Sequence, residues 1–522
     1  MALLNDSERD FATAVSRLAY VNPFLPERIE WERRAIGEEH VPFGGVWHAG
    51  GDPGGQNPNE GRIAARSEAL AGELRERLAG GGRARAATAE ELELYQDLVL
   101  YLLYYRYQAQ LYEAVVAGAR GRKPDLGFYA DFAADGERFL APAAGRLRSR
   151  FEPAHLFACC FQVRRAFHSI FSSILGGSMP AARLRAQVWQ SIFTHDLRRY
   201  QRSLYLCLGD VTTLVTGPSG TGKELVARAI ALSRYIPFDP GTRGFAERPD
   251  ESFFPLNLSA LSPTLIESEL FGHRRGAFTG AMVERAGWLE VCPPLGTVFL
   301  DEIGEVDVAI QIKLLRVLET RTFQRLGDTR DLRFRGKVVA ATHRDLAGEM
   351  AAGRFREDLY YRLCSDRIET PSLAERLRDS PQEISDLVLF LAQRQVGEEA
   401  APDLAREVVA WIDRRLGRDY PWPGNVRELA QCVSNVLIRR EYLPVPRISA
   451  SDPRRALAEE ILAGRLSAEE VLGRYCTLVY AETGSYQETA RRVGLDRRTV
   501  KTRVDPELLA RLQGALSRPP KH

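Results

Sequence analysis

The chain has 522 residues, too many for a single hydrophobic core, so we expect three or four domains. Hydrophobic residues make up 45% and charged residues 27%, which is ordinary for a soluble globular protein, and the net charge of +2 indicates no partner by itself. Seven cysteines without regular spacing and the absence of a signal-peptide pattern at the start argue against secretion, so we expect a cytoplasmic protein.

The most apolar run of the sequence is DLVLYLLYYRYQAQLY, residues 97–112. It is too short for a membrane span, rich in Tyr and interrupted by Arg106. We therefore interpret it as a buried amphipathic helix and expect no membrane partner.

The hydrophobic pattern changes along the chain and indicates four regions. Residues 1–175 show helical periodicity, whereas residues 176–370 alternate short β-branched runs with helical segments, which is typical of a parallel sheet with crossover helices. Residues 371–445 turn helical again, and residues 446–522 comprise a polar, Pro-containing linker and a small terminal unit. The predicted fold class is therefore an α/β core between helical regions.

A phosphate-binding loop is predicted at GPSGTGKE, between an apolar run typical of a strand and a helical segment. Glycines let backbone N–H groups surround phosphate oxygens, and the helix N-terminus adds the positive end of its dipole. The candidate residues are Gly217, Pro218, Ser219, Gly220, Thr221, Gly222, Lys223 and Glu224. Lys223 would reach the outer phosphates, while Glu224 stands where a Mg²⁺-binding Ser or Thr is usual.

Two carboxylates follow a second apolar strand about eighty residues later, in GTVFLDEIGE. Asp301 would hold Mg²⁺, and Glu302 would polarise an attacking water molecule. Together the two motifs predict hydrolysis of ATP with Mg²⁺ as cofactor.

Six motifs, in order and spacing, resemble the AAA+ ATPase domain of bacterial enhancer-binding proteins, the NtrC-type activators of sigma-54 RNA polymerase. The resemblance covers about residues 176–440, and Glu after the loop lysine is usual in that family. The motifs are GPSGTGKE, ESELFGHRRGAFTGA, GTVFLDEIGEVDVAIQIKLLRVLE, VVAATHRDL, GRFREDLYYRL and YPWPGNVREL. The family's usual PPLRER is PSLAER here, which keeps Arg376 but departs at two positions.

The resemblance implies a role for each matching residue. Asp301 would bind Mg²⁺, Glu302 would be the catalytic base, and His343 would sense the γ-phosphate or restrain Glu302. Arg356 and Arg362 would be arginine fingers that reach a neighbouring subunit's nucleotide, so the working protein would be a homo-oligomeric ring, hexameric when active. The α/β subdomain would carry a helical lid over residues 371–445, with Arg427 as its sensor arginine.

The resemblance also explains the run GAFTGA, residues 276–281. Its two glycines would make it a poor strand and a poor helix. In the family this loop rises from the ring and contacts sigma-54, at a height that depends on the nucleotide state. The residues are Gly276, Ala277, Phe278, Thr279, Gly280 and Ala281.

The end of the chain reads as helix, turn, helix in YQETARRVGLDRRTVKTRV and resembles the Fis-type helix-turn-helix of these activators. From residue 474 onward, ten Lys and Arg residues stand against five Asp and Glu, which favours binding to double-stranded DNA. The candidate contacts are Arg497, Arg498, Thr499, Lys501, Thr502 and Arg503.

Three functional hypotheses compete. The main one is a sigma-54-dependent transcriptional activator that remodels the polymerase at upstream promoter sites. The alternatives are a DNA-binding regulator that acts independently of sigma-54, which the intact Phe278-Thr279 loop argues against, and a chaperone-type remodelling ATPase, which would gain nothing from a helix-turn-helix.

The N-terminal module shows no receiver pattern of strand-end Asp, Thr and Lys residues. Cys159 and Cys160 lie near His155, with His168 further along, which leaves a metal or redox sensor open. Cysteines in an aromatic, apolar helix are more often core residues. The more general expectation is a sensor for a small molecule or a protein signal.

Overall fold

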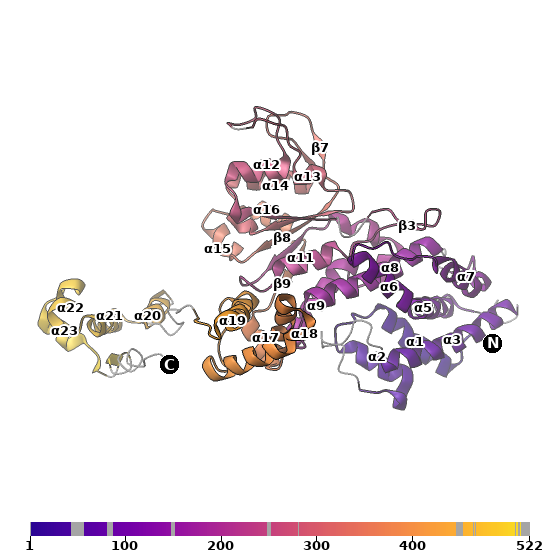
Figure 1. Ribbon diagram of the computed structural model, residues 1–522, viewed down its shortest axis with the longest axis horizontal. Coiled ribbons are helices and arrows are strands. Elements are labelled where there is room, and N and C mark those ends of the chain that lie inside the picture. Colours follow the sequence, from indigo (N-terminus) through magenta and orange to yellow (C-terminus); the bar gives the residue numbers. More distant parts are fainter. Residues whose placement is uncertain are drawn as a thin grey trace. The chain divides into compact units, whose positions relative to one another are not determined.

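The computed structural model divides the chain into two compact units, Met1–Tyr442 and Leu443–His522, each described by itself (Figure 1). It describes residues 2–42, 57–80, 87–147, 152–247, 252–279, 281–444, 453–462, 464, 466–506, 508, 509 and 512. Most of the predicted polar linker therefore lies outside the described residues.

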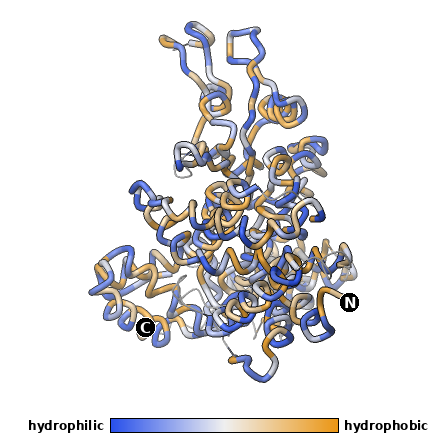
Figure 2. The backbone as a smooth tube through the Cα atoms, turned by 90° about the vertical axis from the view of Figure 1, so that its right-hand side faces the viewer, coloured by the Kyte–Doolittle hydropathy of each residue, from blue (hydrophilic) through white to orange (hydrophobic). Residues whose placement is uncertain are grey.

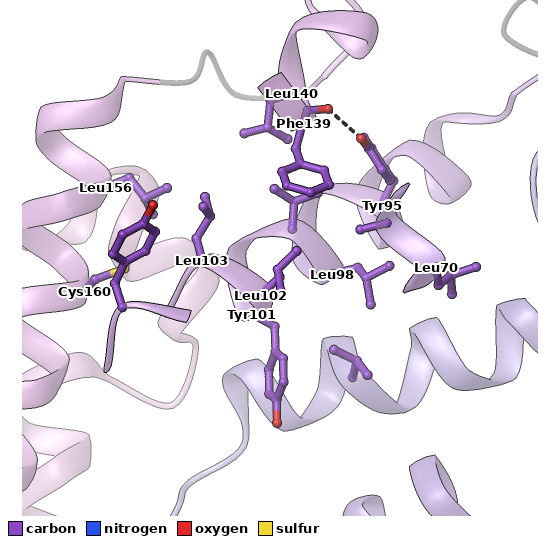
Figure 3. Close-up of a cluster of buried hydrophobic side chains, with 14 of the residues drawn as sticks. Leu70, Tyr95, Leu98, Tyr101, Leu102, Leu103, Phe139, Leu140, Leu156 and Cys160 are labelled. Atoms are coloured by element: carbon purple, nitrogen blue, oxygen red, sulfur yellow. Dashed lines mark hydrogen bonds between the residues drawn. The ribbon is translucent and has the colours of Figure 1, made fainter. Parts of the chain in front are cut away.

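The first unit begins with a helical module built around α5. This helix is buried on most of its faces, and α1, α3 and α7 pack against it. The hydroxyl of Tyr95 donates to the carbonyl of Phe139 at 2.5 Å, so the aromatic core keeps its polar atom satisfied (Figure 3). The helices are α1 (Asp6–Tyr20), α2 (Glu27–Ile36), α3 (Pro58–Ala79), α5 (Ala89–Arg106), α6 (Gln108–Ala119) and α7 (Tyr129–Leu140).

Within the described ranges, no helix is long and apolar enough to cross a membrane. The predicted apolar helix at 97–112 is instead divided between α5 and α6, and most of its α5 part is buried in the module core.

The long helix α8 (Pro153–Ser173) belongs to two hydrophobic cores. Its first half, including Phe157 and Phe161, packs with the N-terminal helices. Its second half, including Ala166 and Ile170, packs with α9 (Met179–Phe193), α11 (Lys223–Ala231) and the central sheet. The helix α8 therefore ties the N-terminal module to the rest of the unit.

The central sheet has five parallel strands in the order β4, β5, β8, β1, β9, which confirms the predicted parallel α/β core. Leu300 of β5 pairs with Leu256 on one side and Ala340 on the other. Because the strands are parallel, their carboxyl ends meet at one edge. The strands are β1 (Thr213–Thr216), β4 (Phe253–Asn257), β5 (Thr297–Asp301), β8 (Lys337–Thr342) and β9 (Asp366–Glu369).

Helices surround this sheet and complete the α/β core. The short helix α10 (Leu197–Arg202) precedes β1. The other helices of the α/β part are α12 (Pro263–Phe271), α13 (Trp288–Val291), α14 (Val308–Thr320), α15 (Leu346–Ala351) and α16 (Glu357–Leu363). A two-stranded hairpin of β6 (Thr322–Phe323) and β7 (Leu332–Arg333) lies beyond α14.

A second contact with the N-terminal module comes from the hairpin of β2 (Phe238–Asp239) and β3 (Gly244–Phe245). Phe238 packs 4.7 Å, centroid to centroid, from both Tyr129 and Phe157, and Phe245 stacks on Phe161 at 4.3 Å. The hairpin follows α11 in sequence but contributes its aromatic rings to the module core.

The lid comprises α17 (Leu373–Asp379), α18 (Glu383–Arg415) and α19 (Asn425–Arg439). The long α18 is interrupted at Gly397, whose φ of 81° is not helical. These helices share a separate core around Trp422, Leu429 and Val433.

The second unit contains α20 (Pro453–Leu462), α21 (Ala468–Thr483), α22 (Tyr486–Val493) and α23 (Arg497–Arg503). Gly494 ends α22 in the left-handed conformation, and Val500 and Val504 pack against Ala490. This is the predicted helix-turn-helix arrangement.

The predicted division at residue 175 falls between α8 and α9. Packing does not separate the two sides there, because Ile170 and Ile174 share one core with Ile230 and Val339. The domain limits taken from the sequence therefore remain a prediction, and a truncation at 175 would expose part of the core around the sheet.

Ile170→Ala tests the shared core. Ile170 is fully buried, so the substitution should lower the free energy of unfolding by about 2–5 kcal/mol, measured by urea denaturation of the full chain. Ser172→Ala, at an exposed position on the same helix, should change it by less than about 0.5 kcal/mol. If the N-terminal module of Ile170→Ala unfolds in a separate, unshifted transition, the two parts do not share a cooperative core.

Candidate functional site

The predicted phosphate loop connects β1 to α11 at the carboxyl edge of the sheet. Gly217, Gly220 and Gly222 all have positive φ values, of 137°, 79° and 92°. A side chain at Gly217 would also meet the hydroxyl of Thr370 at 2.2 Å. Glycine is required here by both conformation and space, and backbone N–H groups can surround an anion.

Lys223 opens α11 and is buried. Its Nζ donates to the carbonyl oxygens of Gly217 and Pro218, at 3.0 and 3.1 Å. Burial lowers the pKa of Lys223, while the nearby Glu302 and Asp301 act in the opposite direction. Among the described residues, the hydrogen-bond partners of the Lys223 ammonium are thus two neutral carbonyls.

Asp301 and Glu302 follow β5 at the same edge. Burial raises the pKa of Asp301, and the adjacent Glu302 raises it further by repulsion. Glu302 has a left-handed backbone, with φ 58° and ψ 47°. Its Oε2 contacts His343 Nδ1 at 2.7 Å and accepts from the His343 N–H at 3.3 Å, so the predicted base and sensor are brought together.

A cavity joins these groups to the lid. Its polar side comprises the phosphate loop with Glu224, Asp301, Glu302, Arg376 and Arg427. Its apolar side is formed by Ile174 and Leu175, which follow α8, and by Leu184, Leu387, Phe390 and Leu391. The arrangement suits a ligand with a charged tail and a planar, apolar head.

The lid is fastened to the phosphate loop at Ser219. Arg427 Nη1 donates to its hydroxyl at 3.0 Å, and Asn425 Nδ2 donates to its carbonyl at 2.9 Å. Asn425 also accepts from the N–H of Leu373 at 2.8 Å and has a φ of 55°. Sequence reasoning missed Asn425, although its place after Pro-Gly in WPGNVREL marks a turn where Asn tolerates positive φ.

Arg356 and Arg362 lie elsewhere. Arg356 precedes α16 and pairs with Asp358, and Arg362 lies 3.4 Å from Glu319. Neither is among the described residues that line the cavity, and both side chains are more than a third exposed. They are therefore available on the surface rather than to the nucleotide cavity of their own chain.

The loop of residues 276–281 follows α12, among the loops projecting at the top of Figures 1 and 2. Ala281 N–H donates to Phe278 O at 3.0 Å, and Gly276 N–H donates to Ala281 O at 2.8 Å. Ala277 is partly buried and Thr279 exposed, whereas Gly280 lies outside the described residues.

Two side chains missed by sequence reasoning hold the base of this loop. The ring of His273 lies 5.0 Å from that of Phe278, and its nitrogens contact Ser268 Oγ and the carbonyl of Val283. Arg274 forms ion pairs with Glu284 and Asp328, both at 2.9 Å. The charged residues of GHRR gave the only sequence indication of this role.

The predicted DNA-binding residues divide into two groups. Arg497, Arg498, Lys501 and Thr502 are exposed on α23. The hydroxyl of Thr499 donates to Asp496, the N-cap of the helix, and Arg503 pairs with Glu469 at 2.6 Å. The first group is free to meet a partner.

The structure brings Cys159 and His155 together, with Sγ 3.6 Å from Nε2. Both ring nitrogens are engaged, however, one by the hydroxyl of Tyr235 at 2.8 Å and the other by the carbonyl of Gln201 at 2.7 Å. Burial raises the pKa of the Cys159 thiol. Among the described residues, no group of three or more metal ligands occurs.

Comparison with known families gives one match. Residues 195–369 match the family described as the sigma-54 interaction domain. This range contains the phosphate loop, the carboxylate pair and the projecting loop.

Similar proteins share the same central part. The transcriptional regulatory protein ZraR of Escherichia coli is 37% identical over 311 residues, covering 56% of this chain and 63% of ZraR. The Nif-specific regulatory protein of Azotobacter vinelandii is 44% identical over 230 residues, covering 44% of this chain and 40% of that protein. The chain thus spans less than two thirds of these relatives.

Among solved structures, NtrX from Brucella abortus in complex with ATP is 24% identical. The alignment covers 72% of this chain and 80% of NtrX, with a TM-score of 0.38.

Asn425→Ala tests the fastening of the lid. It removes two hydrogen bonds and leaves alanine with positive φ, so it should cost on the order of 2 kcal/mol of stability, read as a lower midpoint of thermal unfolding. Asn425→Gly should lose less stability than Asn425→Ala, because glycine adopts positive φ without strain.

Asn435→Ala provides the control, because Asn435 is partly exposed on the same helix and its side chain donates to the carbonyl of Gln431, one turn earlier. Equal midpoints for Asn425→Ala and Asn435→Ala would show that Asn425 does not hold the lid.

Proposed function

We propose that the chain is an ATP-driven transcriptional activator of sigma-54 RNA polymerase, on the premise that its residues 195–369 match the sigma-54 interaction domain family. It would act in the cytoplasm, where it would meet both the polymerase and promoter DNA.

ATP is the proposed ligand of the cavity between the sheet and the lid. The phosphates would lie against the N–H groups of Gly217–Gly222, with Lys223 exchanging its two carbonyl partners for phosphate oxygens. The adenine ring of ATP would lie between Leu175 and Phe390, on the apolar side of the cavity. Arg427 would be the sensor arginine of the lid and would contact the bound nucleotide, since it already donates to Ser219 of the phosphate loop.

Mg²⁺ fits the carboxylate pair, because two adjacent acids and the raised pKa of Asp301 indicate a place where a cation relieves repulsion. When bound, Mg²⁺ would neutralise charge on the phosphate oxygens. Asp301 would be its protein ligand. Thr221 is not free for this purpose, because its hydroxyl donates to Pro218 O and lies 2.7 Å from the hydroxyl of Thr370.

Glu302 is the proposed general base. Glu302 lines the cavity, and its carboxylate is held by His343 at 2.7 Å. If Glu302 released His343 and contacted a water molecule next to the γ-phosphate instead, its carboxylate could accept a proton from that water as the water attacks. His343 thus restrains Glu302 until the phosphate is present.

The charge that develops on the γ-phosphate needs a further cation. Arg356 and Arg362 have surface-exposed side chains, so we propose that they reach the nucleotide of a neighbouring subunit. This requires a ring, for which we propose six subunits.

The projecting loop is the proposed contact with sigma-54. Phe278 would leave the ring of His273 to provide an apolar anchor, and the exposed Thr279 would add a hydrogen bond. The observation that carries the proposal is that the loop and the complete phosphate site occur together within residues 195–369.

Double-stranded DNA is the proposed partner of the second unit. The exposed Arg497, Arg498, Lys501 and Thr502 lie on one short helix that follows a tight turn, the arrangement of a recognition helix. Upstream promoter sites bound there would raise the concentration of the ring near the polymerase.

Lys223→Ala and Glu302→Gln test the nucleotide chemistry. Lys223→Ala removes a charge-assisted contact and should weaken ATP binding by about tenfold or more. Glu302→Gln should keep ATP affinity but lower the rate of hydrolysis by about 10²–10⁴-fold, because only the base is lost. Titration of labelled ATP and release of phosphate provide the two measurements.

Lys123→Ala is the matched control, because Lys123 is an exposed residue of the N-terminal module. If Glu302→Gln hydrolyses ATP at the wild-type rate, Glu302 is not the general base.

Thr279→Ala tests the loop. The residue is exposed and does not line the nucleotide cavity, so ATP hydrolysis should be unchanged. Capture of sigma-54 by protein held with a transition-state analogue of ATP should weaken by about 2 kcal/mol or more. Thr242→Ala, at an exposed position on the β2–β3 hairpin, should have no effect on either measurement.

If Thr279→Ala captures sigma-54 at the wild-type level, the loop is not the working contact. A DNA-binding regulator that acts independently of sigma-54 would then be the better account.

A further inference from the structure

A second cavity lies at the opposite edge of the sheet, where the strands begin. Lys337, the first residue of β8, lines it together with Arg335 and with Arg234, which follows α11. Other walls come from Gln162 of α8, from Tyr200 of α10, and from residues between 205 and 210, between 230 and 237, and at 294 and 295. None of the residues lining this cavity lines the nucleotide cavity.

Three cations, Arg234, Arg335 and Lys337, line the cavity together with one carboxylate, that of Asp210. Lys337 is 3% exposed, and its Nζ donates only to the carbonyls of Val211 and Leu208, at 2.6 and 3.4 Å. Arg234 Nη1 donates to the carbonyls of Pro294 and Gly296. Within the described ranges no ion pair joins Lys337, Arg234 or Arg335 to an acid.

The acids nearby do not neutralise these cations. Asp210 has a 77% exposed side chain and is already paired with Arg321 at 3.0 Å. Asp366 and Glu247 influence Lys337 and Arg234 only as more distant charges. Burial dominates, and it lowers the pKa of Lys337 to about 8 and lowers the pKa of Arg234.

Some cations elsewhere in the described chain have acidic partners, whereas buried Arg165 and Lys223 donate to carbonyls. Arg376 pairs with Glu383, and Arg28 pairs with Glu32 at 2.9 Å and Glu60 at 2.5 Å. A buried charge without a partner is costly, and a partner of opposite sign recovers much of that cost. A bound anion would stabilise Lys337 and Arg234 in the same way, because both are buried and donate to neutral carbonyls.

We propose that this second cavity binds a small phosphate-bearing molecule, with its phosphate among Arg234, Arg335 and Lys337. A planar arginine fork and an ammonium group together match a doubly charged group with several oxygens. The rest of the molecule would lie against apolar walls, which are formed by Leu206, Leu208, Tyr205, Tyr235, Pro237 and Pro294.

The ligand would act where the N-terminal module meets the sheet. Gln162 of α8 lines the cavity and donates to the hydroxyl of Tyr200 at 2.7 Å and to the carbonyl of Ser233 at 2.9 Å. A bound phosphate ester would thus contact both the module and the sheet. The site would be an effector site, and its existence does not depend on the function proposed for the nucleotide cavity.

The test uses the full chain carrying Lys223→Ala, which removes the phosphate loop as a competing site. Inorganic phosphate and phenyl phosphate are titrated by calorimetry, with chloride at equal ionic strength as the reference. We expect saturable binding of phenyl phosphate, tighter than that of inorganic phosphate because of the apolar walls.

Arg335→Ala and Arg335→Glu are the decisive variants, because Arg335 is exposed and its replacement leaves the core intact. Each should weaken binding by about tenfold or more, with the charge reversal the stronger. Arg333→Ala, an exposed arginine two residues away that does not line the cavity, should bind like the parent. No saturable binding, or equal affinity in all three variants, would overturn the proposal.

Discussion

The packing of α8 into two hydrophobic cores is the constraint on which the rest of the first unit depends. Its first half is held by the aromatic rings of the N-terminal module, and Ile170 is held by α11 and the sheet. Interiors are packed too densely for such a helix to shift without disturbing both sides. The module and the α/β core are therefore packed as one body, and a displacement of the module would be transmitted to the sheet.

The route continues into the nucleotide cavity. The chain that leaves α8 places Ile174 and Leu175 on the apolar wall of that cavity. Arg185 of α9 donates to the carbonyls of Ile174 and Gly176, at 3.1 and 2.8 Å, and Arg376 of the lid donates to Leu175 O. A movement of α8 would thus shift both the apolar side of the nucleotide cavity and the lid.

The clustering of the predicted phosphate-site residues could be foreseen from sequence because each lies close to a strand end. The glycines, Lys223, Asp301 and Glu302 each follow a strand within a few residues, so motif and strand pattern were enough to bring them to one edge. The parallel sheet and the helix-turn-helix were predictable for the same reason. Their periodicities are properties of short segments.

Contacts between distant segments could not be predicted in this way. Nothing in the sequence near Phe238 indicates that its ring enters the core of the N-terminal module, and Arg234 and Lys337 meet only because two strand connections converge. Asn425 was missed because its role depends on a left-handed backbone that places its amide against Ser219. Such positions are determined by tertiary packing rather than by local preference.

The central claim is that ATP hydrolysis at the sheet edge drives a change in sigma-54 polymerase through the projecting loop. Formation of open promoter complexes by purified full-length chain, sigma-54 polymerase and promoter DNA tests it most directly. Strand opening should appear with ATP and be absent with a non-hydrolysable analogue, although both nucleotides bind. Equal opening with the analogue, or none with ATP while the chain hydrolyses it, would contradict the account.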